Sequence, residues 1–201
     1  NRYFTNHGPL AMQFESEFES FFNFGNAIAI MNNALAILVA ISGSFNGKLV
    51  ALLSGCEKEV LDAVKISNVD FVNTTIDKLA TESLSEFGMI VVSSNIINKN
   101  NSSFFQGLGK KGITVIICCS LMSDFEYYAN FENAIFVYSL DSGTLVQGGI
   151  IATNDDKVAE TFRNIRSSYG VRKVKKVKAT CNGRFSEIQA GIALNILKEC
   201  I

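Results

Sequence analysis

Residues 136–156, FVYSLDSGTLVQGGIIATNDD, have the pattern of an approach to a cofactor site. A run of β-forming residues leads into a polar turn, the pair Gly148 and Gly149, and a second apolar run that ends in Thr-Asn-Asp. The turn contains no lysine, histidine or cysteine, and its one ionisable side chain is Asp141. The segment therefore indicates either a working site or the shell of one.

Other reactive residue types do not form a catalytic or metal-ligand spacing. The single histidine, His7, has no obvious Ser, Cys or carboxylate partner in sequence, so triad catalysis is not supported. The cysteines are odd in number and show no CxxC or Cys/His pairing, so we expect no metal site, no disulfide framework and a reducing, cytoplasmic location. They are Cys56, Cys118, Cys119, Cys181 and Cys200.

Bulk charge favours neither a nucleic acid nor a membrane as a partner. The 201 residues carry a formal charge of −1, and a polyanion would need a local basic patch. Residues 171–178, VRKVKKVK, could supply one, but without interleaved aromatic residues a solvated edge or loop is the favoured interpretation. The longest apolar stretch, residues 27–41, is interrupted by two asparagines and is shorter than the ~20 residues of a membrane span. The start of the chain shows no signal-peptide pattern.

Hydrophobic periodicity predicts alternating helices and strands within one domain, residues 1–201. Helical spacing or capping signals favour helices at 10–24, 32–42, 57–66, 101–112, 155–170 and 186–200. Apolar runs favour strands at 27–31, 48–54, 69–73, 88–94, 112–120, 133–140 and 148–154. This order predicts an α/β fold, with a mostly parallel sheet between two helical layers.

Four collinear segments resemble the DegT/StrS-type sugar aminotransferases, which use pyridoxal phosphate to aminate nucleotide-linked keto-sugars. They are FTNHGPLAMQFESEFESFF at 4–22, AIAIMNNALAILVAI at 27–41, GGIIATNDDKVAETFRNIRSSYG at 148–170 and CNGRFSEIQAGIAL at 181–194. The resemblance implies the large domain of a type I aminotransferase, a homodimer with sites at the subunit boundary, and no counterpart here of the small C-terminal domain.

The resemblance also identifies positions where this sequence departs from the family. The Schiff-base lysine lies seven residues before the Gly pair, which here is Asp141. The aspartate that holds the pyridinium nitrogen corresponds to Cys118, and the Gly-Thr phosphate turn to Asn33 and Ala34. A carboxylate cannot form an imine and a neutral thiol cannot stabilise a pyridinium comparably. We therefore expect no bound cofactor, with Asn33, Ala34 and Asn182 as vestigial cofactor positions.

The tail motif has two interpretations of equal weight. In the family its asparagine, here Asn182, reaches the phosphate of the neighbouring subunit's cofactor. Alternatively, Asn182 and Gly183 form a turn, while Ser186 and Gln189 cap a helix.

Three hypotheses follow. The leading one is a pseudoenzyme that keeps the fold, has lost pyridoxal-phosphate catalysis, and has a binding or assembly role in nucleotide-sugar metabolism. The second is an active aminotransferase that uses pyridoxal phosphate and a displaced lysine, Lys110 or Lys111 being nearest in sequence. The third is a sugar-nucleotide-binding module with its site near Asn6, His7 and Arg184.

Overall fold

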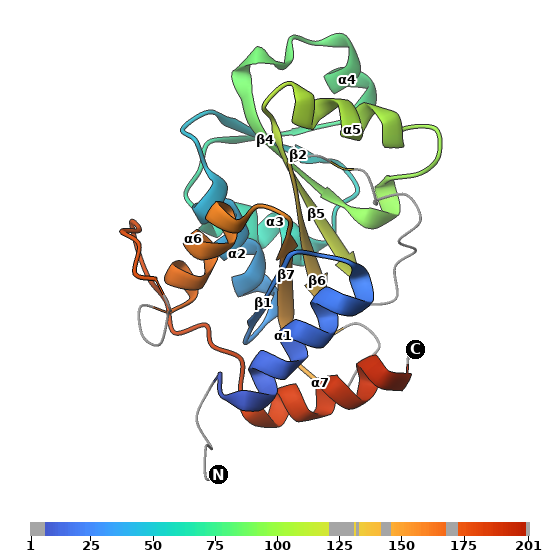
Figure 1. Ribbon diagram of the computed structural model, residues 1–201. Helices are drawn as coiled ribbons and strands as arrows, with labels where there is room; N and C mark the ends of the chain where they lie inside the picture. Colours follow the sequence, from blue (N-terminus) through green and yellow to red (C-terminus); the bar gives the residue numbers. More distant parts are fainter. Residues whose placement is uncertain (1–6, 121–130, 132, 142–145, 168–172, 200–201) are drawn as a thin grey trace.

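The chain forms a seven-stranded sheet with helices on both faces (Figure 1). The computed structural model describes residues 7–120, 131, 133–141, 146–167 and 173–199. The strands are β1 (Asn26–Ile30), β2 (Leu49–Leu53), β3 (Phe71–Thr74), β4 (Phe87–Ser93), β5 (Thr114–Ser120), β6 (Ala134–Ser139) and β7 (Gly149–Thr153). The helices are α1 (Pro9–Phe22), α2 (Asn33–Ser44), α3 (Lys58–Ile66), α4 (Ile76–Thr81), α5 (Ser102–Lys110), α6 (Asp156–Arg166) and α7 (Glu187–Glu199). The short 3₁₀ helices are η1 (Leu84–Glu86) and η2 (Ser94–Ile96).

The strand order is β1-β7-β6-β5-β4-β2-β3, and β7 runs antiparallel to both of its neighbours. All other neighbouring strands are parallel. Alternate residues of β5 enter opposite cores: Ile117 and Cys119 pack in one, Ile116 and Cys118 in the other. Helices α1, α4, α5 and α7 cover the first face, and α2, α3 and α6 the second. The predicted three-layer, mostly parallel α/β fold is confirmed.

Local signals place most elements, with two differences at helix ends. Helix α1 ends at Phe22, two residues before the predicted end at residue 24, because Asn23 adopts a left-handed conformation (φ 56°) and its N–H bonds the carbonyl of Glu19. Gly25, beyond the helix, donates its N–H to Asn154 Oδ1 at 2.8 Å. Helix α6 ends at Arg166, and the predicted helix end at residue 170 lies outside the described residues.

Asn32 was predicted in the first turn of its helix, and the structure makes it the N-cap of α2. Within the described part of the chain, no helix combines the length and apolar character that crossing a bilayer requires.

Candidate functional site at the carboxyl edge of the sheet

The amino terminus of α2 forms an anion-binding geometry at the carboxyl edge of the sheet. Strand β1 ends at Ile30, opposite Gly149, and α2 begins three residues later. Asn32 Oδ1 accepts the N–H of Leu35 at 2.8 Å. The N–H groups of Asn33 and Ala34 donate to no described residue. Free N–H groups at the positive end of a helix are what a phosphate needs.

A side-chain pair lies at the same helix end. Asn33 is 5% exposed and donates its Nδ2 to Glu59 Oε2 at 2.7 Å. Asn33 Oδ1 is buried without a partner among the described residues. Such an orphaned acceptor costs free energy unless a donor reaches it. Glu59 complements the helix dipole, yet its charge also weakens the attraction of a phosphate for this end of α2.

The Gly pair has a packing role. A Cβ on Gly149 would lie 2.7 Å from Ala36 Cβ and 3.0 Å from Asn33 Cα, so glycine is what allows β7 to touch α2. A Cβ on Gly148 would lie 2.7 Å from both Leu140 and Phe185. The two glycines therefore bring the helix terminus and the tail segment to the end of β6.

Asp141, at the Schiff-base position, closes the turn between β6 and β7. Its Oδ1 accepts the N–H of Gly148 at 3.0 Å, and the N–H of Leu140 donates to the Gly148 carbonyl at 2.9 Å. The side chain is exposed. Asp141 therefore has a turn-forming role that needs no cofactor.

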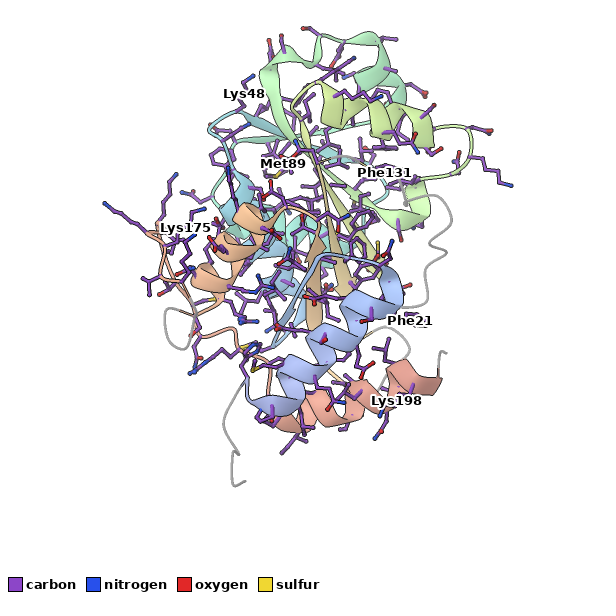
Figure 2. The ribbon with its side chains drawn as sticks, viewed as in Figure 1. Phe21, Lys48, Met89, Phe131, Lys175 and Lys198 are labelled. Atoms are coloured by element: carbon purple, nitrogen blue, oxygen red, sulfur yellow. The ribbon has the colours of Figure 1, made fainter. Side chains whose placement is uncertain are left out.

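No lysine occupies the core beside this turn. All thirteen lysines of the sequence fall within the described residues, and each is exposed. Figure 2 labels three of them, Lys48, Lys175 and Lys198, which extend outward from the ribbon. Lys110 ends α5 and Lys111 caps it, before the start of β5 at Thr114, whereas Cys118 lies near the other end of that strand. The four-residue step along the strand from Thr114 to Cys118 spans roughly 13 Å.

Cys118, at the position of the pyridinium-binding aspartate, is buried and uncharged. Burial, followed by the neighbouring Cys119 thiol, raises the pKa of Cys118 well above its ordinary value of 9.0. Burial likewise raises the pKa of Cys56, whose thiol faces Ser93. Ser93 is the register partner of Cys118 on β4. A neutral thiol offers no charge to hold a protonated pyridine, so this end of the site is weakly polar.

The residues present therefore fit a pyridoxal-phosphate-class group at its phosphate end only. The backbone N–H groups of Asn33 and Ala34 would hold a phosphate, whereas the orphaned Asn33 Oδ1 is an acceptor and needs a donor instead. Neither Cys118 nor Asp141 supplies the charge or amine that the ring requires. When bound, such a group supplies an electron sink at the substrate carbon.

The predicted substrate residue His7 lies in a polar cluster along the edge strand β1. Its Nε2 is 3.0 Å from Arg166 Nη2 and 3.5 Å from Glu15 Oε2. Arg166 Nη1 donates to Glu15 Oε1 at 2.7 Å and to the carbonyl of Ala29 at 3.2 Å. His7 is thus engaged inside the protein.

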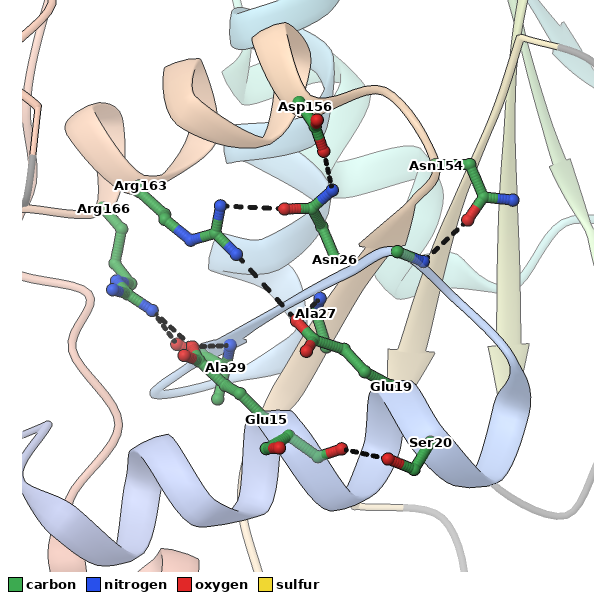
Figure 3. A network of polar contacts seen from close by, with 12 residues as sticks. Glu15, Glu19, Ser20, Asn26, Ala27, Ala29, Asn154, Asp156, Arg163 and Arg166 are labelled. Carbon is green, nitrogen blue, oxygen red and sulfur yellow. Dashed lines mark hydrogen bonds and ion pairs between the residues drawn. The ribbon is translucent and has the colours of Figure 1, made fainter.

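The cluster also closes the free edge of the sheet (Figure 3). Glu15 Oε1 and Glu19 Oε1 accept the N–H groups of Ala29 and Ala27, each at 2.8 Å. Asn26 further along the strand donates to Asp156 Oδ1 at 2.8 Å and accepts from Arg163 at 3.0 Å. Carboxylates from α1 thereby occupy the donors that an unprotected edge strand would offer to another chain.

The tail segment places Arg184 and Asn182 beside the end of β1. Arg184 forms a bridge with Ile30, and the N–H of Met31 donates to the Gly183 carbonyl at 2.9 Å. Arg184 Nε donates to the exposed Asn182 Oδ1 at 3.4 Å. The structure therefore brings Asn182, Arg184 and His7 to the same corner as the α2 terminus. Asn6 lies outside the described residues.

The tail motif also has a structural role that sequence reasoning missed. Glu187 accepts the N–H groups of Gly8, Leu10 and Ala11 at 2.8–3.0 Å and so caps α1. The predicted Ser186 and Gln189 capping box is present, with the Gln189 N–H donating to Ser186 Oγ at 3.1 Å. The available signal in the sequence was the Gly8-Pro9 pair that opens α1. Neither residue has a side chain that can cap the helix, so the capping group must come from elsewhere in the chain.

No protein-family model and no curated protein matches the sequence. Solved structures do match its fold. NtdA from Bacillus subtilis, with bound cofactor PMP, is 19% identical with a TM-score of 0.80, over 96% of this chain and 48% of that one. DesI in the presence of its TDP-sugar product is 16% identical with a TM-score of 0.78, over 96% and 54%. A DegT/DnrJ/EryC1/StrS aminotransferase from Brucella abortus is 18% identical with a TM-score of 0.71, over 96% and 60%.

These matches confirm the predicted resemblance at the level of fold, which is that of the large domain of type I aminotransferases. The chain spans about half to three fifths of the length of those proteins. The expectation of no cofactor is wrong: NtdA, which shares this fold, was solved with bound PMP. The expectation rested on side chains, whereas the backbone N–H groups that suit a phosphate remain at the start of α2.

Proposed function

We propose that this protein binds a pyridoxal-phosphate-class cofactor non-covalently, by its phosphate, at the amino terminus of α2. The protein then has a binding or assembly role in nucleotide-sugar metabolism and does not carry out lysine-dependent transamination. The observation that carries the proposal is the exposure of all thirteen lysines, together with the turn-closing bond of Asp141 to Gly148. Without a buried amine, the cofactor has no covalent attachment and substrate protons have no lysine shuttle.

The test compares pyridoxal 5′-phosphate with pyridoxal, which lacks the phosphate, by the melting temperature of the protein. We expect only the phosphorylated form to raise the melting temperature, because the α2 terminus recognises an anion. Borohydride treatment followed by peptide mass analysis is expected to leave no stoichiometric adduct on any lysine. A specific adduct, with Lys58 at the start of α3 the candidate at this edge of the sheet, would support the active-enzyme alternative instead.

Two substitutions at one position sharpen the test. Ala34→Ser adds a hydroxyl to the phosphate end and is expected to tighten binding. Ala34→Asp places a negative charge there, which the helix dipole tolerates but which repels a phosphate. We expect the Asp variant to fold normally and to lose the response to pyridoxal 5′-phosphate. Equal responses of both variants would place the ligand elsewhere.

A nucleotide-linked sugar is the substrate class we propose for the same corner, because DesI was solved with its TDP-sugar product. Arg184 is held near the α2 terminus by the backbone bridge to Ile30, and guanidinium groups suit diphosphates. Calorimetric titration with a TDP-sugar tests this. The absence of both binding heat and a shift in melting temperature would contradict this proposal.

We also propose a homodimer. Its support is apolar surface on the packed helices α1 and α7, where Leu10, Ile188 and Ile192 are 40%, 75% and 43% exposed. Sedimentation equilibrium measures the mass in solution, and a monomer at every concentration would contradict the proposal. The cytoplasmic location stays a prediction from cysteine usage.

A further inference from the structure

A cavity opens at the carboxyl edge of the sheet, away from the α2 terminus. It has a volume of about 580 Å³ and lies beyond the ends of β2, β3 and η2, between α4 and the start of α5. None of its lining residues belongs to α2, β7 or the tail segment. A larger cavity of about 1080 Å³ opens at the opposite edge, beside Thr114 and Ala134, so size alone does not identify a binding site.

The position of the smaller cavity follows from the topology. Strands β2 and β4 are neighbours, and their connections leave in opposite directions, through α3 to β3 and through α5 to β5. Helix α3 packs on one face of the sheet and α5 on the other. The connections that follow two such strands diverge and leave a crevice outside the carboxyl ends of the strands, which is where open α/β sheets bind ligands.

The lining is rich in hydroxyl and amide groups and poor in charge. Its polar residues are Ser54, Thr75, Asp77, Asn98, Asn100 and Asn101. Asp77 is its one charged side chain, and no lysine or arginine contributes to it. A phosphorylated or carboxylated ligand would therefore find no counter-charge in the cavity and would be repelled by Asp77. A neutral or cationic polyol matches groups that both donate and accept.

The asparagine loop that forms one wall is held by its own bonds. Asn101 Oδ1 accepts the N–H of Asn98 at 2.8 Å, and Asn101 Nδ2 donates to the Ile96 carbonyl at 2.9 Å. Asn98 Oδ1 accepts the N–H of Asn100 at 2.9 Å. Asn98 Nδ2, the Asn100 amide and the Asp77 carboxylate bond to no described residue. They are thus available to a ligand on a wall that needs little further ordering.

An aromatic face completes the cavity. Phe104 lines it and is half-buried, with its ring held edge-on against Phe105 at a centroid distance of 5.4 Å. A fixed ring of this kind packs against the apolar C–H face of a sugar ring. We propose that this cavity binds an unphosphorylated sugar ring, and an amino sugar in preference, with Asp77 as the partner of the ammonium group. The site is independent of the cofactor proposed at α2.

The experiment is a titration of the full chain, labelled with ¹⁵N, with glucosamine, glucose and glucose 1-phosphate. We expect glucosamine to produce saturable shifts in the side-chain amide signals of Asn98, Asn100 and Asn101. Glucose should bind the same residues about fivefold more weakly, as expected for one exposed charge pair, and glucose 1-phosphate more weakly still. Asp77→Asn should abolish the preference for glucosamine over glucose, while the matched control Asp70→Asn retains it.

Saturable shifts at these amides, with a preference that depends on Asp77, would establish the site. The absence of saturable shifts for all three sugars would overturn it, as would tighter binding of glucose 1-phosphate than of glucosamine. A preference unchanged in Asp77→Asn would overturn the assigned role of the carboxylate. Pyridoxal 5′-phosphate added to the same sample should leave these amide signals unmoved, which separates this site from the one at α2.

Discussion

Replacing Glu15 by glutamine tests the polar cluster that closes the edge of β1. The Glu15 side chain is 12% exposed, and Arg166, its partner at 2.7 Å, is 6% exposed. Removing one partner of a buried ion pair costs roughly 3–5 kcal/mol, because the other charge stays buried. Glutamine can still accept the N–H of Ala29, and Arg166 keeps its bonds to the Ala29 carbonyl and to His7. We therefore expect a loss at the lower end, about 3 kcal/mol.

The pH dependence of this effect follows from the direction of the pKa shift. Burial alone would raise the pKa of Glu15, but the contact with His7, the charge of Arg166 and the Ala29 N–H together lower it below 4.5. The stabilisation by the carboxylate is thus fully present above 4.5, the unfolded value, and is lost as the pH falls through the lowered folded value. The difference in the free energy of unfolding between the wild type and Glu15→Gln should therefore narrow as the pH falls below 4.5.

Urea unfolding followed by circular dichroism, at neutral pH and in a descending pH series, measures both effects. Glu17→Gln is the matched control, because Glu17 is exposed on the same helix and its loss should change stability by no more than about 0.5 kcal/mol. Equal unfolding free energies for the two variants at neutral pH would refute the reasoning. A gap that stays constant through the acid range would refute the assignment of the effect to an ionised carboxylate.

Two further perturbations test the packing that positions the site. Gly149→Ala should lower stability by about 2 kcal/mol, because the added Cβ would lie 2.7 Å from α2. The control Gly107→Ala, with no atom within 4 Å of the added Cβ, should raise stability by about 0.5–1 kcal/mol. Thermal melts in which the two variants change stability alike would contradict this prediction. Glu187→Gln should cost about 1–2 kcal/mol by weakening the cap on α1, measured by urea unfolding, and amide exchange at Leu10 and Ala11 should accelerate; unchanged exchange there would exclude the capping role.

Much of the fold could be predicted from the sequence, because the signals that specify it are local. The continuous apolar runs of β4 and β5 predicted strands covered on both faces, and both are buried along nearly their whole length. The Ser186 and Gln189 pattern predicted the start of α7, where the capping bonds are present. Asn23 was missed as the end of α1, because an asparagine that turns left-handed has no strong pattern beside a nearby glycine.

The candidate site depends on sequence and tertiary structure in a different way from the fold. The sequence alone determined that position 141 has no amine and position 118 no carboxylate, since residue type excludes a reaction wherever the residue lies. Only the tertiary structure decided that Asp141 closes a turn, that every lysine is exposed, and that Glu187 caps a helix 177 residues away in sequence. Contacts of that span depend on how the layers pack, and pairs such as Glu15 and Arg166 leave no periodicity in the sequence. The expectation of no cofactor was wrong for a different reason: it was drawn from side chains, whereas the N–H groups that suit a phosphate belong to the backbone of a helix terminus.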